Sequence, residues 1–382
     1  MKPVRSLNIS DIHLGCRRLF ADWMVANLLD LILPLIPQID LLVIEGDLYD
    51  TAVGFADVPA IYIVRFIATL LKACDEHNVT VRVLRGTFSH DRTQCAIIPE
   101  LYTASKATND VKYMDKIQLE YIERFDMRVV YIPDNVPYQS SEDVIVAVKD
   151  LMATMGWDTV DYAYVHGSFD HTLPAVAARH CKVLFRVEQF DFVTRYVVVG
   201  HIHQHSIKGH VINNGSVDRL CHGEEEPKGL VLIDDQVTEA KITFVENTKA
   251  TRFVTYDISH LDGEESHLTD YIEEQLALLP LDVQKHIRII HPRADIRGAV
   301  TQYLRNKFPL VRFTHDKGAG VENAEEVETI VDVDDEDAGV AITEEVLPQL
   351  LHAHVTAQNK DLSLSDILDL MAMTEQVDGL SR

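Results

Sequence analysis

The sequence has few cysteines and no uninterrupted apolar run of membrane-spanning length. Its five cysteines, in 382 residues, form no Cys-x-x-Cys pair, which argues against a disulfide framework or a zinc knuckle. The longest apolar stretches are interrupted by Pro34 and Pro37 or by Arg65, and the first residues lack the apolar core of a secretion signal. We therefore expect a cytoplasmic protein with no membrane-spanning segment.

Basic residues are also scarce. The chain has 35 Lys and Arg against 60 Asp and Glu, which gives a formal net charge of -25. Such a charge argues against a protein that holds nucleic acid by itself over a broad basic surface. It does not exclude a nuclease, because a metal site needs acidic ligands and a partner can supply the basic track.

Residues 1–248 have the pattern of one layered α/β domain. Short apolar runs predict buried strands, and the longer amphipathic segments between them predict helices. The apolar runs are Leu41–Ile44, Val79–Leu84, Tyr162–Val165 and Tyr196–Val199. The amphipathic segments include 21–36, 59–74 and 109–125.

A smaller α/β domain is predicted at 249–320, where strand-like and helix-like stretches alternate. These stretches are 252–256, 266–279, 287–290, 295–307 and 310–313.

An acidic linker is predicted at 321–341, because nine of the sixteen residues from Glu322 to Asp337 are acidic and none is basic. Residues 342–382 then predict two short amphipathic helices, at 346–354 and 364–373, which cannot form a core of their own. They either fold back on the body of the protein or dock in the groove of a partner.

Five short segments carry residues that suit metal chemistry, and each directly follows a predicted strand. They are Ser10–His13, Glu45–Asp50, Arg85–Asp91, Val165–Gly167 and Gly200–His203. In an α/β sheet, the loops beyond the carboxyl ends of the strands converge on one edge. Residues nearly two hundred positions apart are therefore expected to meet in one cleft.

Carboxylates and imidazoles dominate these segments, and such ligands suit manganese, iron or zinc better than calcium. Asp11 and His13 are two positions apart, as are His201 and His203, so both side chains of a pair point to the same side of an extended segment. Each segment alone is weak evidence. The strength lies in five segments in one order, each at a strand end.

This order of motifs resembles that of the calcineurin-like metallophosphoesterase superfamily: Asp-x-His, Gly-Asp-x-x-Asp, a loop ending in His-Asp, a lone His and Gly-His-x-His. Within it, the chain is most similar to the nuclease subunit of the SbcCD-type DNA double-strand-break repair complex, particularly its bacteriophage members. Residues 214–219 and 223–229 support this closer match, because they look like the segment that follows the last histidines in that family. The resemblance implies a layered β-sandwich flanked by helices, with a capping domain. If the protein is viral, the resemblance also implies that it is located in the cytoplasm of a bacterial host.

The resemblance further implies a centre of two divalent metal ions, most simply manganese. The ligands that it assigns are Asp11, His13, Asp47, His166, His201 and His203. The first ion would be held by the Asp-x-His pair and the last histidine. The second would be held by the lone histidine and the first histidine of the His-x-His pair, and Asp47 would bridge both ions.

Three more residues receive roles from the resemblance. His90 would contact the scissile phosphate and act as general acid, a role typically worth about 10²–10⁴ in rate. Asp91 would orient His90, and Asp50 would contact the metal ligands without binding a metal ion itself.

The chain departs from the family in the loop Gly86-Thr87-Phe88-Ser89-His90-Asp91, where the family has Gly-Asn-His-Asp. Ser89 aligns with the asparagine, whose carbonyl oxygen would ligate the second metal, and the loop is one or two residues longer. Either Ser89 or Thr87 ligates with its hydroxyl, directly or through water, or the second site is weakened. The sequence favours a working site, with Ser89 as the predicted ligand.

Arg17, Arg18, Arg85 and Arg92 flank two of these segments and are candidates for contacting a DNA backbone. The alternative is that they pair with the abundant carboxylates.

The resemblance implies two protein partners. One is an SMC-like ATPase of the ABC type with coiled-coil arms, docked through the C-terminal helices. The other is a second copy of this chain, with 59–74 and 109–125 as candidate interface helices.

The implied function is a metal-dependent DNA nuclease, an exonuclease on double strands and an endonuclease on single strands, within a complex that processes DNA ends. Two alternatives stay open. One is a phosphodiesterase or phosphatase of the same superfamily that acts on nucleotides or other small esters. The other is a non-catalytic scaffold that binds DNA ends or the ATPase.

Overall fold

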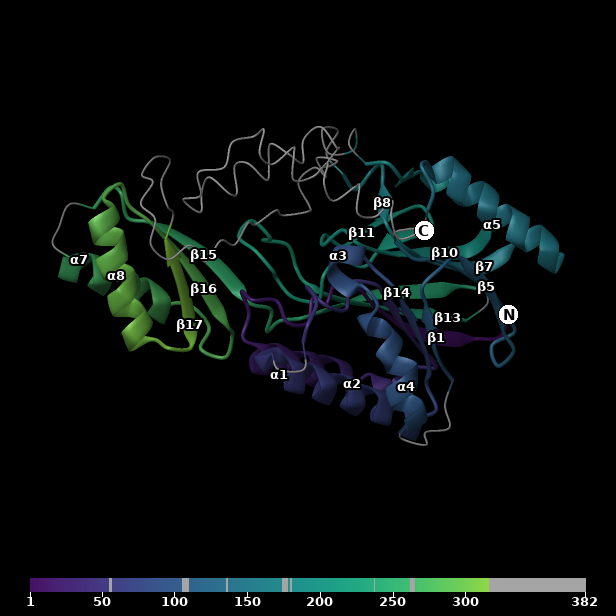
Figure 1. Cartoon of the computed structure of the whole chain (residues 1–382), viewed down its shortest axis with the longest axis horizontal. Helices are drawn as coiled ribbons and strands as arrows, with labels where there is room; N and C mark the ends of the chain where they lie inside the picture. Colours follow the sequence, from purple (N-terminus) through teal and green to yellow (C-terminus); the bar gives the residue numbers. More distant parts are fainter. Residues whose placement is uncertain are drawn as a thin grey trace, which may run out of the picture. The chain divides into compact units, whose positions relative to one another are not determined.

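The computed structural model describes residues 1–54, 57–104, 110–134, 137–173, 178, 181–236, 238–261 and 265–315. Its main feature is a pair of six-stranded mixed sheets (Figure 1). From edge to edge, the first sheet contains β14 (Ala240–Glu246), β13 (Gly229–Asp235), β1 (Val4–Ile9), β2 (Leu41–Glu45), β3 (Thr80–Leu84) and β4 (Val111–Met114). The second contains β11 (Ser206–Lys208), β12 (Val211–Asn213), β10 (Val193–Gly200), β7 (Val160–His166), β6 (Met127–Ile132) and β5 (Gln118–Ile122).

Helices cover the outer faces of the two sheets. They are α1 (Ala21–Ile32), α2 (Val58–Glu76), α4 (Ile97–Ala104) and α5 (Ser141–Met155). The first three pack on the first sheet and α5 packs on the second, so α5 lies on the opposite side of the pair of sheets from the other three (Figure 1). The predicted layered β-sandwich flanked by helices is therefore confirmed.

Strand β2 illustrates why a continuous apolar run forms a strand here. Leu41 and Val43 point into the layer between the two sheets, whereas Leu42 and Ile44 point toward the helices. Because side chains alternate along a strand, a strand covered on both faces needs an apolar residue at every position. Val81 and Val83 of β3 also face the helices, which follows the same alternation.

A third sheet is formed by β15 (Arg252–Asp257), β16 (Lys285–Ile290) and β17 (Val311–His315), which are parallel. Helices α7 (Glu265–Ala277) and α8 (Ala294–Lys307) pack on it around a separate apolar cluster. The alternation predicted for this part of the chain is confirmed, and the domain boundary at 249 stays a prediction.

The chain divides into two compact units, Met1–Leu173 with Lys182–Glu325, and Pro174–Cys181 with Glu326–Arg382. The second unit lies almost entirely outside the described residues. The predicted acidic linker and C-terminal helices fall there, so both stay predictions.

The predicted helix at 109–125 is wrong, because the described part of this segment forms β4 and β5. In β4, the partly buried Val111 and Tyr113 alternate with the exposed Lys112. Each strand is the edge of one sheet, where only one neighbouring strand is needed. Two short strands with a turn between them imitate the spacing of an amphipathic helix.

The remaining described elements are short. They are α3 (Phe88–Asp91), β8 (Ser168–Phe169), β9 (Leu184–Phe185), and three 3₁₀ turns at Ile36–Gln38, Gln94–Ala96 and Val187–Phe190. Among the helices that the structure describes, none combines the length and the apolar character needed to cross a membrane.

Candidate metal centre

The carboxyl ends of strands from both sheets meet closely at one edge of the sandwich. A Cβ atom on Gly200, at the end of β10, would lie 2.3 Å from the carbonyl oxygen of Glu45 and 2.7 Å from the Cβ of Ser10. A Cβ atom on Gly46, whose φ is 90°, would lie 2.3 Å from Nδ1 of His166. Only glycine allows such an approach, so the convergence expected from the five segments is present.

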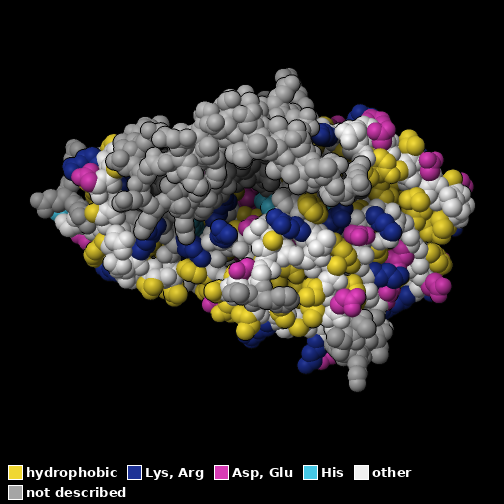
Figure 2. Space-filling view, in the orientation of Figure 1, with side chains coloured by type: hydrophobic (Ala, Val, Ile, Leu, Met, Phe, Trp, Pro, Cys, Tyr) yellow, Lys and Arg dark blue, Asp and Glu magenta, His cyan; other side chains and the backbone are white. Residues whose placement is uncertain are grey.

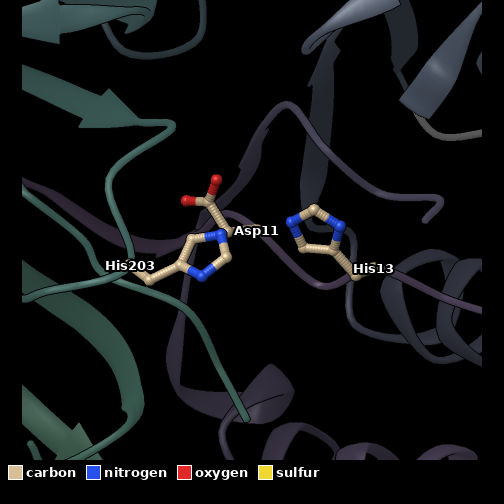
Figure 3. A group of neighbouring side chains, drawn as sticks. All are labelled: Asp11, His13 and His203. Carbon is tan, nitrogen blue, oxygen red and sulfur yellow. The ribbon is translucent and has the colours of Figure 1, made fainter. Parts of the chain in front are cut away.

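The six predicted ligands form two groups of three residues. The groups are Asp11 with His13 and His203, called the first group here, and Asp47 with His166 and His201, called the second group. Within each group the candidate ligand atoms lie within 4.8 Å of one another. Figure 3 shows the first group, in which the carboxylate of Asp11 lies beside the ring of His203 and the ring of His13 lies nearby.

Four of these ligands have a backbone conformation that residues other than glycine rarely adopt. The φ angles are 52° at Asp11, 51° at His13, 50° at Asp47 and 106° at His201. Such residues persist only where surrounding contacts hold them, and they concentrate at functional sites. Here the carbonyl oxygen of Asp47 accepts a hydrogen bond from the backbone N–H of His13 at 3.0 Å.

In the second group, the hydrogen bonds of His166 determine its tautomer. Its Nδ1 is 2.6 Å from the carbonyl oxygen of Glu45, which can only accept, so Nδ1 carries a proton. Its Nε2 is 3.2 Å from Oδ2 of the buried Asp47. A neutral imidazole would therefore direct a lone pair at a carboxylate, which is unfavourable unless a proton or a cation lies between them.

The electrostatics of this pair reflect that need for positive charge. Burial lowers the pKa of His166, but the charge of Asp47 outweighs burial and raises that pKa to about 10. Burial raises the pKa of Asp47, but His166 outweighs burial and holds that pKa well below its ordinary value. A divalent cation ligated by both atoms would replace the proton, so the donor set fits a metal ion.

In the first group, His13 provides a second indication that the residues fit a cation. Its Nδ1 lies 3.3 Å from Oδ1 of Asp50, and its buried Nε2 has no hydrogen-bond partner among the described residues. Burial lowers the pKa of His13, but Asp50 and Asp47 outweigh burial and raise it. A buried nitrogen without a partner is unfavourable, and ligation of a metal ion would satisfy it.

His203 is oriented by a buried ion pair that the sequence did not reveal. Its Nδ1 donates to Oε1 of Glu224 at 3.0 Å, which leaves Nε2 to ligate. Glu224 also pairs with the buried Nζ of Lys228 at 2.8 Å, and this Nζ donates to the carbonyl oxygen of His203 at 3.0 Å. Carboxylates often hold metal-binding histidines in this way. The only signal in the sequence is the segment 223–229.

Asp91 holds the loops of the site through three backbone N–H groups. Its carboxylate accepts hydrogen bonds from the backbone N–H groups of Asp47, Tyr49 and Gly86, at 3.1, 3.0 and 2.7 Å. Burial and the charge of Asp47 raise its pKa to about 6. The hydrogen bonds found for the described residues include none between Asp91 and the imidazole of His90, so the predicted orienting role stays a prediction.

His90 lies beside the first group. Its Nδ1 donates to the carbonyl oxygen of Asp50, and its ring meets the ring of His13 edge to face at a centroid distance of 4.7 Å. His13, Asp50 and His90 also form a third set of potential ligands. The structure therefore brings His90 and Asp50 to the site, as expected.

Thr87 and Ser89 occupy different environments in the loop after β3. The Oγ1 of Thr87 lies 3.2 Å from Oδ2 of Asp47, 3.4 Å from Nε2 of His166 and 3.5 Å from Nδ1 of His201. Ser89 lies in α3, exposed to solvent. Ligation by Ser89 stays a prediction, but it is Thr87 that lies among the second group.

The four candidate arginines differ in their surroundings. Arg17 and Arg92 are exposed. Arg18 donates to the carbonyl oxygen of Leu220 at 3.3 Å, and Arg85 donates to that of Asp134 at 3.2 Å. Arg18 and Arg85 therefore hold backbone segments near the site, and contact of any of the four with DNA stays a prediction.

The sequence matches no protein-family model and no curated protein. The structure is similar to that of TT1561 of Thermus thermophilus, with 12% identity over 64% of this chain and 99% of the other, at a TM-score of 0.37. It is also similar to GAP50, the anchor in the inner membrane complex of Plasmodium, with 12% identity over 65% of this chain and 86% of the other, at a TM-score of 0.36.

Proposed function

We propose that this chain is a metal-dependent DNA nuclease of the calcineurin-like metallophosphoesterase type. One observation carries the proposal: two adjacent groups of carboxylates and imidazoles, each with two buried members, place the potential ligand atoms of each group within 4.8 Å of one another. Asp47 lies near both groups, since its carboxylate contacts His166 and its backbone carbonyl accepts from His13. This is the arrangement expected of a centre for two divalent cations, of which manganese suits the mixed nitrogen and oxygen donors.

The chemistry that two such cations supply when bound is activation of a water molecule and neutralisation of phosphate charge. The residues of the chain would hold the two cations and transfer the proton. Because Nδ1 of His90 donates to the carbonyl oxygen of Asp50, Nε2 is the nitrogen left to give a proton to the leaving oxygen. Asp91 fixes the backbone of Asp47 and Gly86, so the loops that carry Asp47 and His90 keep their positions relative to each other.

The sequence resemblance favours DNA as the substrate, and the exposed Arg17 and Arg92 provide cations for a phosphate backbone. Figure 2 shows Lys and Arg side chains beside the histidine atoms visible on one face. The net charge of -25 favours the second candidate, a phosphodiesterase for small esters, because a broad basic track is lacking. A partner that supplies this track reconciles the charge with DNA.

The proposed complex has two further components. The ATPase of the ABC type would dock on the C-terminal helices, which lie outside the described residues. The second copy of this chain would dock on α2, where Val58 is 79% and Ile61 is 72% exposed, one helical turn apart.

A manganese-dependent assay on end-labelled duplex DNA and on bis-p-nitrophenyl phosphate tests the proposal. We expect the wild-type chain to cleave both and the Asp47→Ala chain to cleave neither. Cleavage of the small ester alone would replace the nuclease by the second candidate. No cleavage of either substrate, with no bound metal by elemental analysis, would leave a scaffold that binds DNA ends or the ATPase.

A further inference from the structure

Thr87 follows Gly86 directly, and the structure surrounds its side chain with the three ligands of the second group. The backbone N–H of Thr87 donates to Oδ1 of Asp47 at 2.6 Å, which fixes the position of the residue. Its Oγ1 then faces Oδ2 of Asp47 at 3.2 Å, Nε2 of His166 at 3.4 Å and Nδ1 of His201 at 3.5 Å. Four potential donor atoms thus converge on one small volume.

The separations between these atoms suit a shared cation better than hydrogen bonds. Metal–ligand bonds of about 2.0–2.2 Å place neighbouring ligands of a tetrahedral or octahedral ion roughly 2.8–3.6 Å apart. The three separations from Oγ1 all lie within that range. As hydrogen bonds, the two to histidine are long, and one hydroxyl hydrogen cannot serve all three. The two lone pairs of the hydroxyl oxygen remain available to a metal ion.

We propose that Thr87 supplies the neutral oxygen ligand of the second group, an inference that rests on the proposed function. Thr87 then stands where the asparagine directly follows the glycine in the Gly-Asn-His-Asp pattern. The two additional residues, Phe88 and Ser89, come after the ligand, at the start of α3. The side chains of Phe88 and Ser89 are exposed, so the insertion lengthens the loop without entering the second group.

Substitution by cysteine tests ligation directly, because a thiolate bound to Co²⁺ gives an intense charge-transfer absorption band. We expect the Thr87→Cys chain loaded with two equivalents of Co²⁺ to show this band above the wild-type spectrum. Ser89→Cys should not show it, nor should Thr93→Cys, a matched control at an exposed threonine of the following turn. A band in Ser89→Cys, or the absence of a band in Thr87→Cys, would overturn the inference.

Metal affinity gives an independent measurement with more conservative variants. Thr87→Val keeps the shape and removes the oxygen, so the weaker of two Mn²⁺ dissociation constants should rise by at least about 10–100-fold, the effect typical of losing a supporting partner. Thr87→Ser and Thr87→Asn retain an oxygen donor and should keep both ions. An unchanged dissociation constant in Thr87→Val would refute ligation by Thr87. A wild-type chain that binds fewer than two ions would instead refute the proposed function, and the inference with it.

Discussion

The sandwich buries one cluster of charges around Arg82 in the layer between the sheets, called the interlayer region here, and another at the candidate metal centre at their edge. The two balance charge differently. Between the sheets, the fully buried guanidinium of Arg82 donates to both carboxylate oxygens of Glu120, at 2.8 and 2.7 Å, and also to Asp110. Tyr131 and Lys112 donate to the same Glu120, at 2.7 and 2.6 Å. Each nitrogen of Arg82 has an acceptor within the chain.

At the metal centre the balance is incomplete. His13 has a buried nitrogen with no partner among the described residues, and Nε2 of His166 faces a carboxylate. The cluster around Arg82 therefore needs no partner from outside the chain, whereas bound cations would balance the charges at the edge. Buried charges left unsatisfied are unfavourable for folding, so their presence at one edge indicates a function there.

Removing the central carboxylate of the edge should have the largest effect. Asp47→Asn keeps an oxygen for the N–H of Thr87 but loses the charge that holds cations, so hydrolysis of bis-p-nitrophenyl phosphate with Mn²⁺ should fall by at least about 10³-fold. Circular dichroism should show a metal-free melting temperature within a few degrees of wild type. Asp150→Asn, at an exposed residue of α5, is the matched control. Wild-type rates in Asp47→Asn would contradict the two-metal proposal.

Removing the central cation of the interlayer region should act on stability instead. Arg82→Met leaves Glu120 with only Lys112 and Tyr131, so the free energy of unfolding in urea should fall by about 3 kcal/mol, the lower end of the range for breaking a buried pair. Arg65→Met, at an exposed residue of α2, should change it by less than about 0.5 kcal/mol. Equal losses in both variants would show that the interlayer pair contributes nothing particular.

Acid distinguishes the loss of this ion pair from a loss of packing. Burial raises the pKa of Glu120, but the hydrogen bond and charge of Arg82 outweigh burial and lower it from 4.5 to about 2. The pair therefore contributes fully above pH 4.5, and its contribution is lost as the pH falls toward 2. The difference in stability between wild type and Arg82→Met should shrink over that interval. A constant difference would assign the effect to packing.

The sequence allowed the residues of the candidate metal centre to be placed together largely because strand ends are easy to locate. The apolar run at Leu41–Ile44 is buried on both faces, and the parallel order of β1, β2 and β3 carries the residues that follow each strand to one edge. Asp11 and Asp47 could therefore be placed together with no knowledge of the packing. The same periodicity failed at 109–125, where two edge strands and a turn give helix-like spacing.

Two features of the site depend on details that spacing does not contain. Thr87 and Ser89 both offer a hydroxyl, and spacing alone does not indicate which of them lies at the second group. The hydrogen bond from the backbone N–H of Thr87 to Asp47 places Thr87 there. Glu224 lies in a run of three glutamates, of which only the tertiary fold selects one to face His203. The structure supplies both choices, because they concern which side chain points inward.

Glu224 combines features of both regions. It pairs with a buried cation, as Glu120 does in the interlayer region, and it hydrogen-bonds to His203 at the edge. Glu224→Gln keeps the size of the side chain but weakens its hold on Nδ1 of His203, so Mn²⁺ affinity at the first group should fall by about 10–100-fold. Isothermal titration calorimetry would measure this change, with the exposed neighbour Glu225→Gln as the matched control.

Lys228 decides how this result should be interpreted, because Glu224→Gln leaves its buried ammonium without a carboxylate. The double variant Glu224→Gln/Lys228→Met removes that charge as well. If it regains stability but not affinity, Glu224 acts on the metal centre through His203. If affinity returns together with stability, the ion pair serves only the fold, and the balance of charge at the edge would resemble that between the sheets more closely than the geometry indicates.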